Sequence, residues 1–202
     1  MKVMQPEGNY YNKYESKNPI AKLLMTGFFN SMQELLCNIN YDTIYEAGCG
    51  EGYVTNFIAN LNKNAKICAS DISDKKIQEA SKFVPSAQFS VESIYDISQA
   101  DDSFDLVIAS EVLEHLEQPE KALDEILRIS KKYILVSVPN EPIWRVCNVL
   151  RGKYWRDLGN TPGHIQHWGK KQFCNMVGKR CQILEAKAPF PWTMLLCEKN
   201  NV

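Results

Sequence analysis

The feature that most constrains the fold is an alternation of short apolar runs with helical patterns from residue 43 onward. Runs such as LVIA and YILV are apolar throughout, which is typical of strands buried on both faces. The expected strands are residues 43–47, 66–70, 87–91, 104–109 and 133–138. Apolar residues recurring at three- and four-residue steps predict helices at about 53–62, 74–83 and 119–131. This order predicts a parallel sheet covered by helices on both faces.

Both ends of the chain depart from this alternation. Apolar spacing along residues 20–36 predicts an amphipathic helix before the first strand. Near the other end, a helix at about 169–179 precedes two strand-like runs, 182–188 and 193–198. The few residues between these runs cannot make a parallel crossover, so the runs should pair antiparallel. We therefore expect an α/β, Rossmann-like fold, with a seven-stranded, mostly parallel sheet and an antiparallel last strand.

Length and composition indicate one globular domain spanning residues 1–202, with 45% hydrophobic and 23% charged residues. The net charge of −1 predicts no overall attraction to polyanions. Residues 91–130 nevertheless carry eleven acidic and two basic side chains, and residues 131–180 carry two acidic and ten basic ones. This segregation either steers an anionic substrate toward the later segment or belongs to a solvated surface.

The cysteines indicate a reducing environment. The chain has seven, scattered and without a C-x-x-C pair, so neither a disulfide framework nor a zinc knuckle is expected. The first residues contain no apolar core typical of a signal peptide, and no apolar run approaches the roughly 18–20 residues that span a bilayer. We expect a cytoplasmic protein without a membrane span, and the oligomeric state stays open.

A glycine-rich loop follows the first expected strand and precedes a helix. Its sequence, EAGCGEG over residues 46–52, places glycine at 48, 50 and 52, where the backbone can turn tightly and approach a ligand. The N–H groups at the start of the next helix suit an anionic ligand group. A nicotinamide or flavin dinucleotide site would need G-x-G-x-x-G, and Tyr53 breaks that pattern.

The pattern E-x-G-C-G-x-G instead resembles the first motif of the class I S-adenosylmethionine-dependent methyltransferases. The resemblance extends from about residue 41 to 199 and includes FDLVIASEVLEHL at the fourth strand. It implies that Asp71, in ASDIS, takes both ribose hydroxyls of S-adenosylmethionine or of its product S-adenosylhomocysteine. Relatives often read G-D where this chain has Glu92-Ser93-Ile94, and Ser93 would accept from the adenine amino group. The implied cofactor-binding residues are Glu46, Gly48, Cys49, Gly50, Gly52, Asp71, Ile72, Ser93, Ile94 and Ser110.

The candidate catalytic residues come from the histidine-bearing segments. Methyl transfer is a displacement that releases a neutral thioether, so the chemistry needs positioning and, for a hydroxyl acceptor, a base. Glu111, Glu114 and His115 follow the fourth strand at i, i+3 and i+4, and would share one face if that segment is helical. These three are the predicted catalytic residues.

The same residues also suggest a metal site. Carboxylates and imidazole without thiolate suit Mg²⁺ or Mn²⁺ better than Zn²⁺, and His164 would complete a set with Glu111, Glu114 and His115. The arrangement resembles the ubiquinone-pathway O-methyltransferases and the enzymes that methylate terminal 2′-hydroxyls of small RNAs. In the latter, a later histidine is followed four residues on by Trp, as in His164 and Trp168. In metal-free relatives with E-V-L-E-H, Glu111 would line the cofactor pocket and His115 would act as the base.

The acceptor side is predicted in two further segments. Residues 139–169 have no clear period and carry an aromatic-basic cluster, from which Arg151, Trp155 and His164 are predicted to meet the acceptor. Such interleaving suits an anionic small molecule or a nucleic acid. Residues 1–40 correspond to a segment that folds over the cofactor as a helical lid in relatives, and there Tyr14 is a candidate acceptor contact.

The sequence therefore predicts an enzyme that methylates a hydroxyl of a small-molecule, lipid-like or sugar-like acceptor. One alternative is an RNA 2′-O-methyltransferase that uses a divalent metal. The other is a cofactor-binding subunit without activity.

Overall fold

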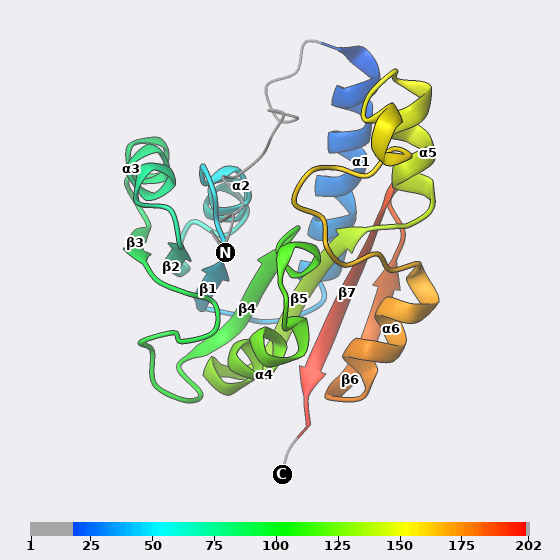
Figure 1. The fold of residues 1–202 in the computed structure, drawn as a ribbon. Coiled ribbons are helices and arrows are strands. Elements are labelled where there is room, and N and C mark those ends of the chain that lie inside the picture. The colour runs from blue at the N-terminus through cyan, green and yellow to red at the C-terminus, as the bar shows by residue number, and fades with distance from the viewer. Residues whose placement is uncertain (1–17, 201–202) are drawn as a thin grey trace.

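A seven-stranded sheet lies at the centre of the computed structural model, which describes residues 18–200 (Figure 1). The strand order is β3-β2-β1-β4-β5-β7-β6. Neighbours from β3 to β5 run parallel, whereas β7 runs antiparallel to both β5 and β6. The strands are β1 (Thr43–Ala47), β2 (Lys66–Asp71), β3 (Gln88–Val91), β4 (Phe104–Ser110), β5 (Ser130–Pro139), β6 (Cys181–Lys187) and β7 (Trp192–Lys199). The predicted Rossmann-like sheet with an antiparallel last strand is confirmed.

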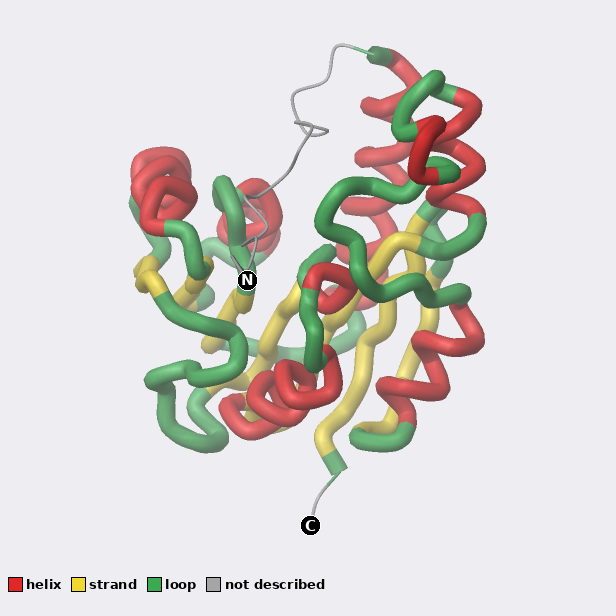
Figure 2. The backbone as a smooth tube through the Cα atoms, in the orientation of Figure 1, coloured by secondary structure: helices red, strands yellow, loops and turns green. Residues whose placement is uncertain are grey.

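Helices cover both faces of this sheet (Figure 2). The helical elements are α1 (Pro19–Leu36), α2 (Tyr53–Leu61), α3 (Asp74–Phe83), η1 (Leu113–His115), α4 (Pro119–Ile129), α5 (Ile143–Leu150), η2 (Trp155–Asp157) and α6 (Lys170–Gly178). On one face, Ile44 and Leu106 pack with Phe28 of α1 and Ile58 of α2. The alternate strand residues point the other way, because successive side chains in a strand face opposite sides.

On that opposite face, Val107 and Ile134 pack with Leu123 of α4 and Phe173 of α6. Because strands β1, β2, β4 and β5 run parallel, they all end at one edge of the sheet, where the loops that follow them come together. In open α/β sheets, this edge is where ligands bind.

Helix α5 is the element that the sequence does not predict, since residues 139–169 show no clear period. The helix has only eight residues, which is about two turns. Trp144 and Cys147 turn inward, while Val146 and Leu150 are exposed on the other side. A segment this short repeats its apolar spacing too few times for a period to be recognised in the sequence.

The amino-terminal lid prediction is only partly within the described residues. Helix α1 begins after Asn18, whose Oδ1 accepts from the Ile20 N–H at 2.9 Å, and it buries Phe28, Met32 and Leu35 against the sheet. Tyr14 lies outside the described residues. Among residues 18–200, no helix is long and apolar enough to cross a membrane.

Candidate cofactor and acceptor site

The glycine loop after β1 adopts a backbone that only glycine takes easily. Gly48, Gly50 and Gly52 have φ angles of 78°, 53° and 84°. A Cβ on Gly48 would lie 2.5 Å from a methyl group of Val112, so this position also excludes a side chain by space. The loop is tied to the end of β2, because the N–H groups of Gly48 and Cys49 both donate to the Ser70 carbonyl at 2.7 and 2.9 Å.

The carboxylate of Asp71 is oriented by two backbone groups at the end of β2. Oδ2 accepts from the Gly50 N–H and Oδ1 from the Ser73 N–H, both at 2.9 Å. Each carboxylate oxygen can accept a second hydrogen bond. The side chain predicted to bind the ribose therefore lies directly beside the glycine loop.

Glu46 lies beneath the loop as a buried carboxyl. Its Oε2 accepts from the Thr55 hydroxyl of α2 at 2.5 Å, and its side chain is almost fully enclosed. Burial raises the pKa of Glu46 from 4.5 to about 8, opposed by the Thr55 hydrogen bond and reinforced by the nearby Asp71. Thr55 is a partner that the sequence analysis missed, since it lies nine positions away on the next element.

The predicted adenine-side residues follow β3. The Ser93 hydroxyl accepts from the Tyr95 N–H at 3.3 Å, and Ile94 packs against the core beneath it. Ile72 is exposed just after Asp71. Ser110, at the end of β4, shares a 2.9 Å hydrogen bond with Ser137 of β5. These positions border the same edge of the sheet as the glycine loop.

Glu111 contacts Trp192 and is not part of the cluster that contains the other predicted catalytic residues. It has φ 61°, and its Oε2 accepts from the Trp192 indole N–H at 2.6 Å. The helical segment covers only Leu113–His115, so Glu111, Glu114 and His115 do not share one helical face. The reason is the left-handed backbone at Glu111, which turns the chain before η1 begins.

Three of the four predicted metal-site residues do come together. One ligand atom from each of Glu114, His115 and His164 lies within 4.8 Å of the other two, and Glu111 is not in this group. The two imidazole rings meet edge-on with centroids 4.8 Å apart. Glu114 and His164 are buried. The residues come from segments almost fifty positions apart.

Backbone hydrogen bonds hold these two segments together. His115 Nδ1 lies 2.9 Å from the Gly163 carbonyl oxygen, and the N–H groups of Ile165 and Gln166 both donate to the Glu114 carbonyl at 3.0 Å. Because a carbonyl oxygen only accepts, Nδ1 of His115 carries the hydrogen. In the neutral ring, Nε2 is then the nitrogen without a hydrogen.

Aromatic rings form one wall beside His164. The Trp144 ring stacks over His164 at a centroid distance of 6.1 Å and also contacts Trp192 at 5.7 Å. The sequence analysis did not single out Trp192, which is on β7 and reaches this edge only through the antiparallel pairing with β5. No local pattern marks it.

The predicted acceptor residues Arg151 and Trp155 lie on the outer, solvent-facing side of the α5–η2 segment, which is residues 143–157. Both are exposed, and the Arg151 guanidinium donates to the side-chain oxygen of Asn148. They are therefore part of the same segment as His164 but face solvent.

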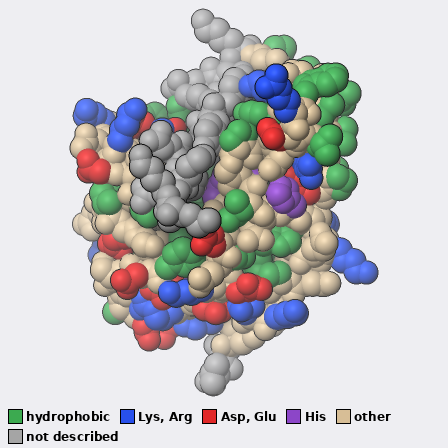
Figure 3. Space-filling model, in the orientation of Figure 1, with side chains coloured by type: hydrophobic (Ala, Val, Ile, Leu, Met, Phe, Trp, Pro, Cys, Tyr) green, Lys and Arg blue, Asp and Glu red, His purple; other side chains and the backbone are tan. Residues whose placement is uncertain are grey.

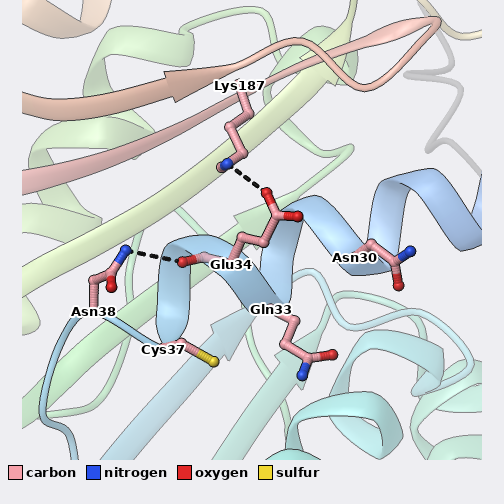
Figure 4. A pocket seen from close by; sticks show the side chains of 6 residues that line it. All are labelled: Asn30, Gln33, Glu34, Cys37, Asn38 and Lys187. Carbon is pink, nitrogen blue, oxygen red and sulfur yellow. Dashed lines mark hydrogen bonds and ion pairs between the residues drawn. The ribbon is translucent and has the colours of Figure 1, made fainter.

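A separate surface hollow of about 560 Å³ lies beside the end of α1, away from these motifs (Figure 4). Its polar groups interact with each other: Lys187 pairs with Glu34 at 2.5 Å, and Asn38 donates to the Glu34 carbonyl at 3.2 Å. Figure 4 shows these groups along the rim rather than converging on a ligand position. We assign it no role.

Comparisons with known proteins agree with this geometry. Residues 45–134 match the family described as Methyltransferase domain. The mitochondrial ubiquinone biosynthesis O-methyltransferase of Dictyostelium discoideum is 25% identical over 209 aligned residues, covering 93% of this chain and 60% of that protein. The chain spans between about a fifth and three fifths of the length of the curated relatives it matches.

Solved structures share the fold. Magnesium protoporphyrin IX methyltransferase from Synechocystis, solved with bound S-adenosylhomocysteine, has a TM-score of 0.68 and 18% identity over 92% of this chain and 89% of that one. A methyltransferase from Aquifex aeolicus that depends on S-adenosylmethionine has a TM-score of 0.70 and 13% identity, with 91% and 94% covered. The family match supports an enzyme.

Proposed function

We propose that this chain, which carries a methyltransferase domain of the class I S-adenosylmethionine-dependent type, transfers the cofactor's methyl group to an acceptor hydroxyl. The acceptor class is a small molecule, including lipid-like and sugar-like compounds. The observation that carries the proposal is the placement of two clusters at one edge of the sheet. The glycine loop with Asp71 follows β1 and β2, and the Glu114–His115–His164 cluster follows β4 and β5.

The cofactor is assigned to the first cluster. Asp71 would receive the two ribose hydroxyls, since each carboxylate oxygen keeps one acceptor position after its backbone bond. Gly48–Gly52 would face the amino-acid end of the cofactor, because no side chain separates that backbone from a ligand. Ser93 and Ile94 would border the adenine.

The base is assigned to His115. Its Nδ1–H is held by the Gly163 carbonyl, so the Nε2 lone pair can take the acceptor proton. As the hydroxyl oxygen bonds to the methyl carbon, the carbon–sulfur bond breaks and its electron pair stays on the neutral thioether. Glu114 Oε1, 3.9 Å from Nε2, would stabilise the imidazolium that forms.

The cluster also fits a divalent metal. With Glu111 turned toward Trp192, the remaining donors are two imidazole nitrogens and one carboxylate oxygen, a set that suits Mn²⁺, Fe²⁺ or Zn²⁺ better than Mg²⁺. Glu114, His115 and His164 would hold the ion. When bound there, it would lower the pKa of a coordinated hydroxyl. His115 Nε2 cannot be both ligand and base, so the two versions of the site exclude each other.

RNA is the second candidate acceptor. The observation that favours it is the His164–Trp168 spacing together with exposed Arg151 and Arg156 on the outer segment. Tritiated cofactor and a cell extract separated by size distinguish the two. Label in nucleic acid would favour RNA, and label in the small-molecule fraction would favour the main proposal.

The test of the cofactor site is Asp71→Ala. We expect S-adenosylhomocysteine to bind about 10- to 150-fold more weakly by calorimetry, equivalent to about 1.5–3 kcal/mol for lost hydrogen bonds to a charged group. Asp74→Ala is the matched control, because Asp74 is an exposed carboxylate three residues later. Equal affinity in the wild type and Asp71→Ala would contradict the assignment.

A further inference from the structure

An apolar surface faces outward on the segment that follows β5. On α5, Val146 and Leu150 are 54% and 80% exposed, and just beyond η2, Leu158 is 74% exposed. Trp155, within η2, is 66% exposed. We call these four side chains the outer apolar face. Figure 3 shows hydrophobic side chains gathered at the upper right, where Figure 1 places α5.

Hydrogen bonds hold this face in its outward position. The Asn148 side chain, enclosed in the segment, donates to the Gly159 carbonyl at 2.8 Å, and Arg145 Nε donates to the Leu158 carbonyl at 3.1 Å. A Cβ on Gly159 would come within 2.2 Å of the Arg145 carbonyl oxygen, so the loop packs closely on α5. The apolar side chains are therefore presented by an ordered scaffold.

The backbone of Leu158 is strained. It has φ 48°, in the left-handed region that leucine rarely adopts, and its side chain gains little burial in return. A left-handed backbone is strained for a non-glycine residue and is retained where the surroundings or a function require it. Asparagine tolerates this backbone far better and would remove the apolar side chain.

The charges around the outer apolar face are mostly positive. Residues 143–158 contain four basic side chains, Arg145, Arg151, Lys153 and Arg156, against the single acidic Asp157. Arg151 and Arg156 are exposed. An apolar surface with Trp at its border and cations around it is the chemistry that meets an anionic lipid surface. A second copy of the same face is a poorer partner, because the like charges would repel.

We propose that the outer apolar face docks on an anionic lipid surface, with the protein lying on the bilayer. The same segment returns through Gly163 and His164 to the catalytic cluster, so docking would bring that cluster next to the membrane. If the proposed methyl transfer is also correct, the acceptor would enter from the lipid phase. Docking itself does not depend on that activity.

The experiment is flotation of the full chain with vesicles of phosphatidylcholine, with or without phosphatidylglycerol. We expect the wild type to bind only the anionic vesicles and to be released by salt. Val146→Ser with Leu150→Ser should reduce binding about tenfold or more, because each removes apolar surface from the contact. Leu184→Asn, an exposed leucine on β6, is the matched control and should bind as the wild type does.

Leu158→Asn separates docking from folding. It should weaken vesicle binding several-fold while leaving the melting temperature equal or higher, because asparagine relieves the left-handed backbone. Absence of wild-type binding to anionic vesicles would overturn the proposal, as would unchanged binding of the double variant. Self-association of the wild type through this face, lost in the double variant without any vesicle binding, would identify a protein interface and equally overturn it.

Discussion

The glycine loop and the α5–η2 segment both border the same edge of the sheet, yet they are built in opposite ways. The loop is short, and its backbone is set by the end of the neighbouring strand β2, with Gly48 tied to Ser70 and Gly50 to Asp71. The α5–η2 segment is long and turns apolar side chains outward. It joins the site through the ring of Trp144 and through the residues that follow it, which bond to η1. Such a pairing suits an enzyme whose cofactor is constant and whose acceptor contacts are specialised.

The largest expected effect is on kcat, and it tests whether His164 of the later segment acts together with His115. His115→Ala should lower kcat by about 10²- to 10⁴-fold if His115 is the base, the usual contribution of a positioned base. A large loss is also expected if His115 is instead a metal ligand. His164→Ala should lower it comparably only if the cluster holds an ion. In that case EDTA should also abolish activity, and Mn²⁺ should restore it better than Mg²⁺ does.

His167→Ala is the matched control for both histidine variants, because His167 is exposed and its Nε2 lies 2.8 Å from the side-chain oxygen of Asn160. Activity that resists EDTA and survives His164→Ala would leave His115 as a metal-free base. Full activity of His115→Ala would remove this cluster from the chemistry.

The second prediction tests the local rigidity of the glycine loop. Gly48→Ala should destabilise the fold by about 2–4 kcal/mol and weaken S-adenosylhomocysteine binding, because the new methyl group meets Val112 and the φ of 78° is strained for alanine. Urea unfolding and calorimetry measure the two effects. Gly27→Ala in α1 is the control: a Cβ there meets nothing within 4 Å, so stability should rise by up to about 1 kcal/mol.

The third prediction concerns the buried carboxyl beneath the loop. Because the pKa of Glu46 is raised to about 8 in the fold, its protonated form contributes stability at low pH that is lost as the pH rises toward 8. Relative to Glu46→Gln, the wild type without cofactor should lose up to about 1.4 kcal/mol per pH unit between about pH 6 and pH 8.

Urea unfolding across that range measures the difference. Glu120→Gln, at an exposed carboxyl on α4, should show no such change in slope. Parallel pH profiles for the wild type and Glu46→Gln would mean that Glu46 ionises normally in the fold.

The same contrast explains what could be predicted from the sequence. Strand β1 and helix α3 occupy the residues expected, because buried strands and amphipathic helices leave a local apolar pattern. Helix α5 was missed because its eight residues give only about two turns of apolar spacing. The meeting of His115 with His164 was predicted from the types of ligand in the two segments and from the resemblance to methyltransferases with a later histidine. The turn of Glu111 toward Trp192 was not predicted, because it depends on one left-handed residue and on a distant strand.

The smallest expected effect tests whether the exposed arginines serve the acceptor side alone. Arg151→Ala with Arg156→Ala should lower kcat/KM for an anionic acceptor about three- to tenfold, since exposed charges contribute about 1 kcal/mol or less each. Cofactor affinity should stay unchanged, because both side chains lie on the outer side of the α5–η2 segment. Lys170→Ala with Lys171→Ala removes the same charge from exposed positions on α6 and is the control. A parallel loss of cofactor binding would show that the arginines support the fold, since Arg151 is bonded to the buried Asn148. The distinction between a cofactor-binding glycine loop and an acceptor-binding α5–η2 segment would then fail.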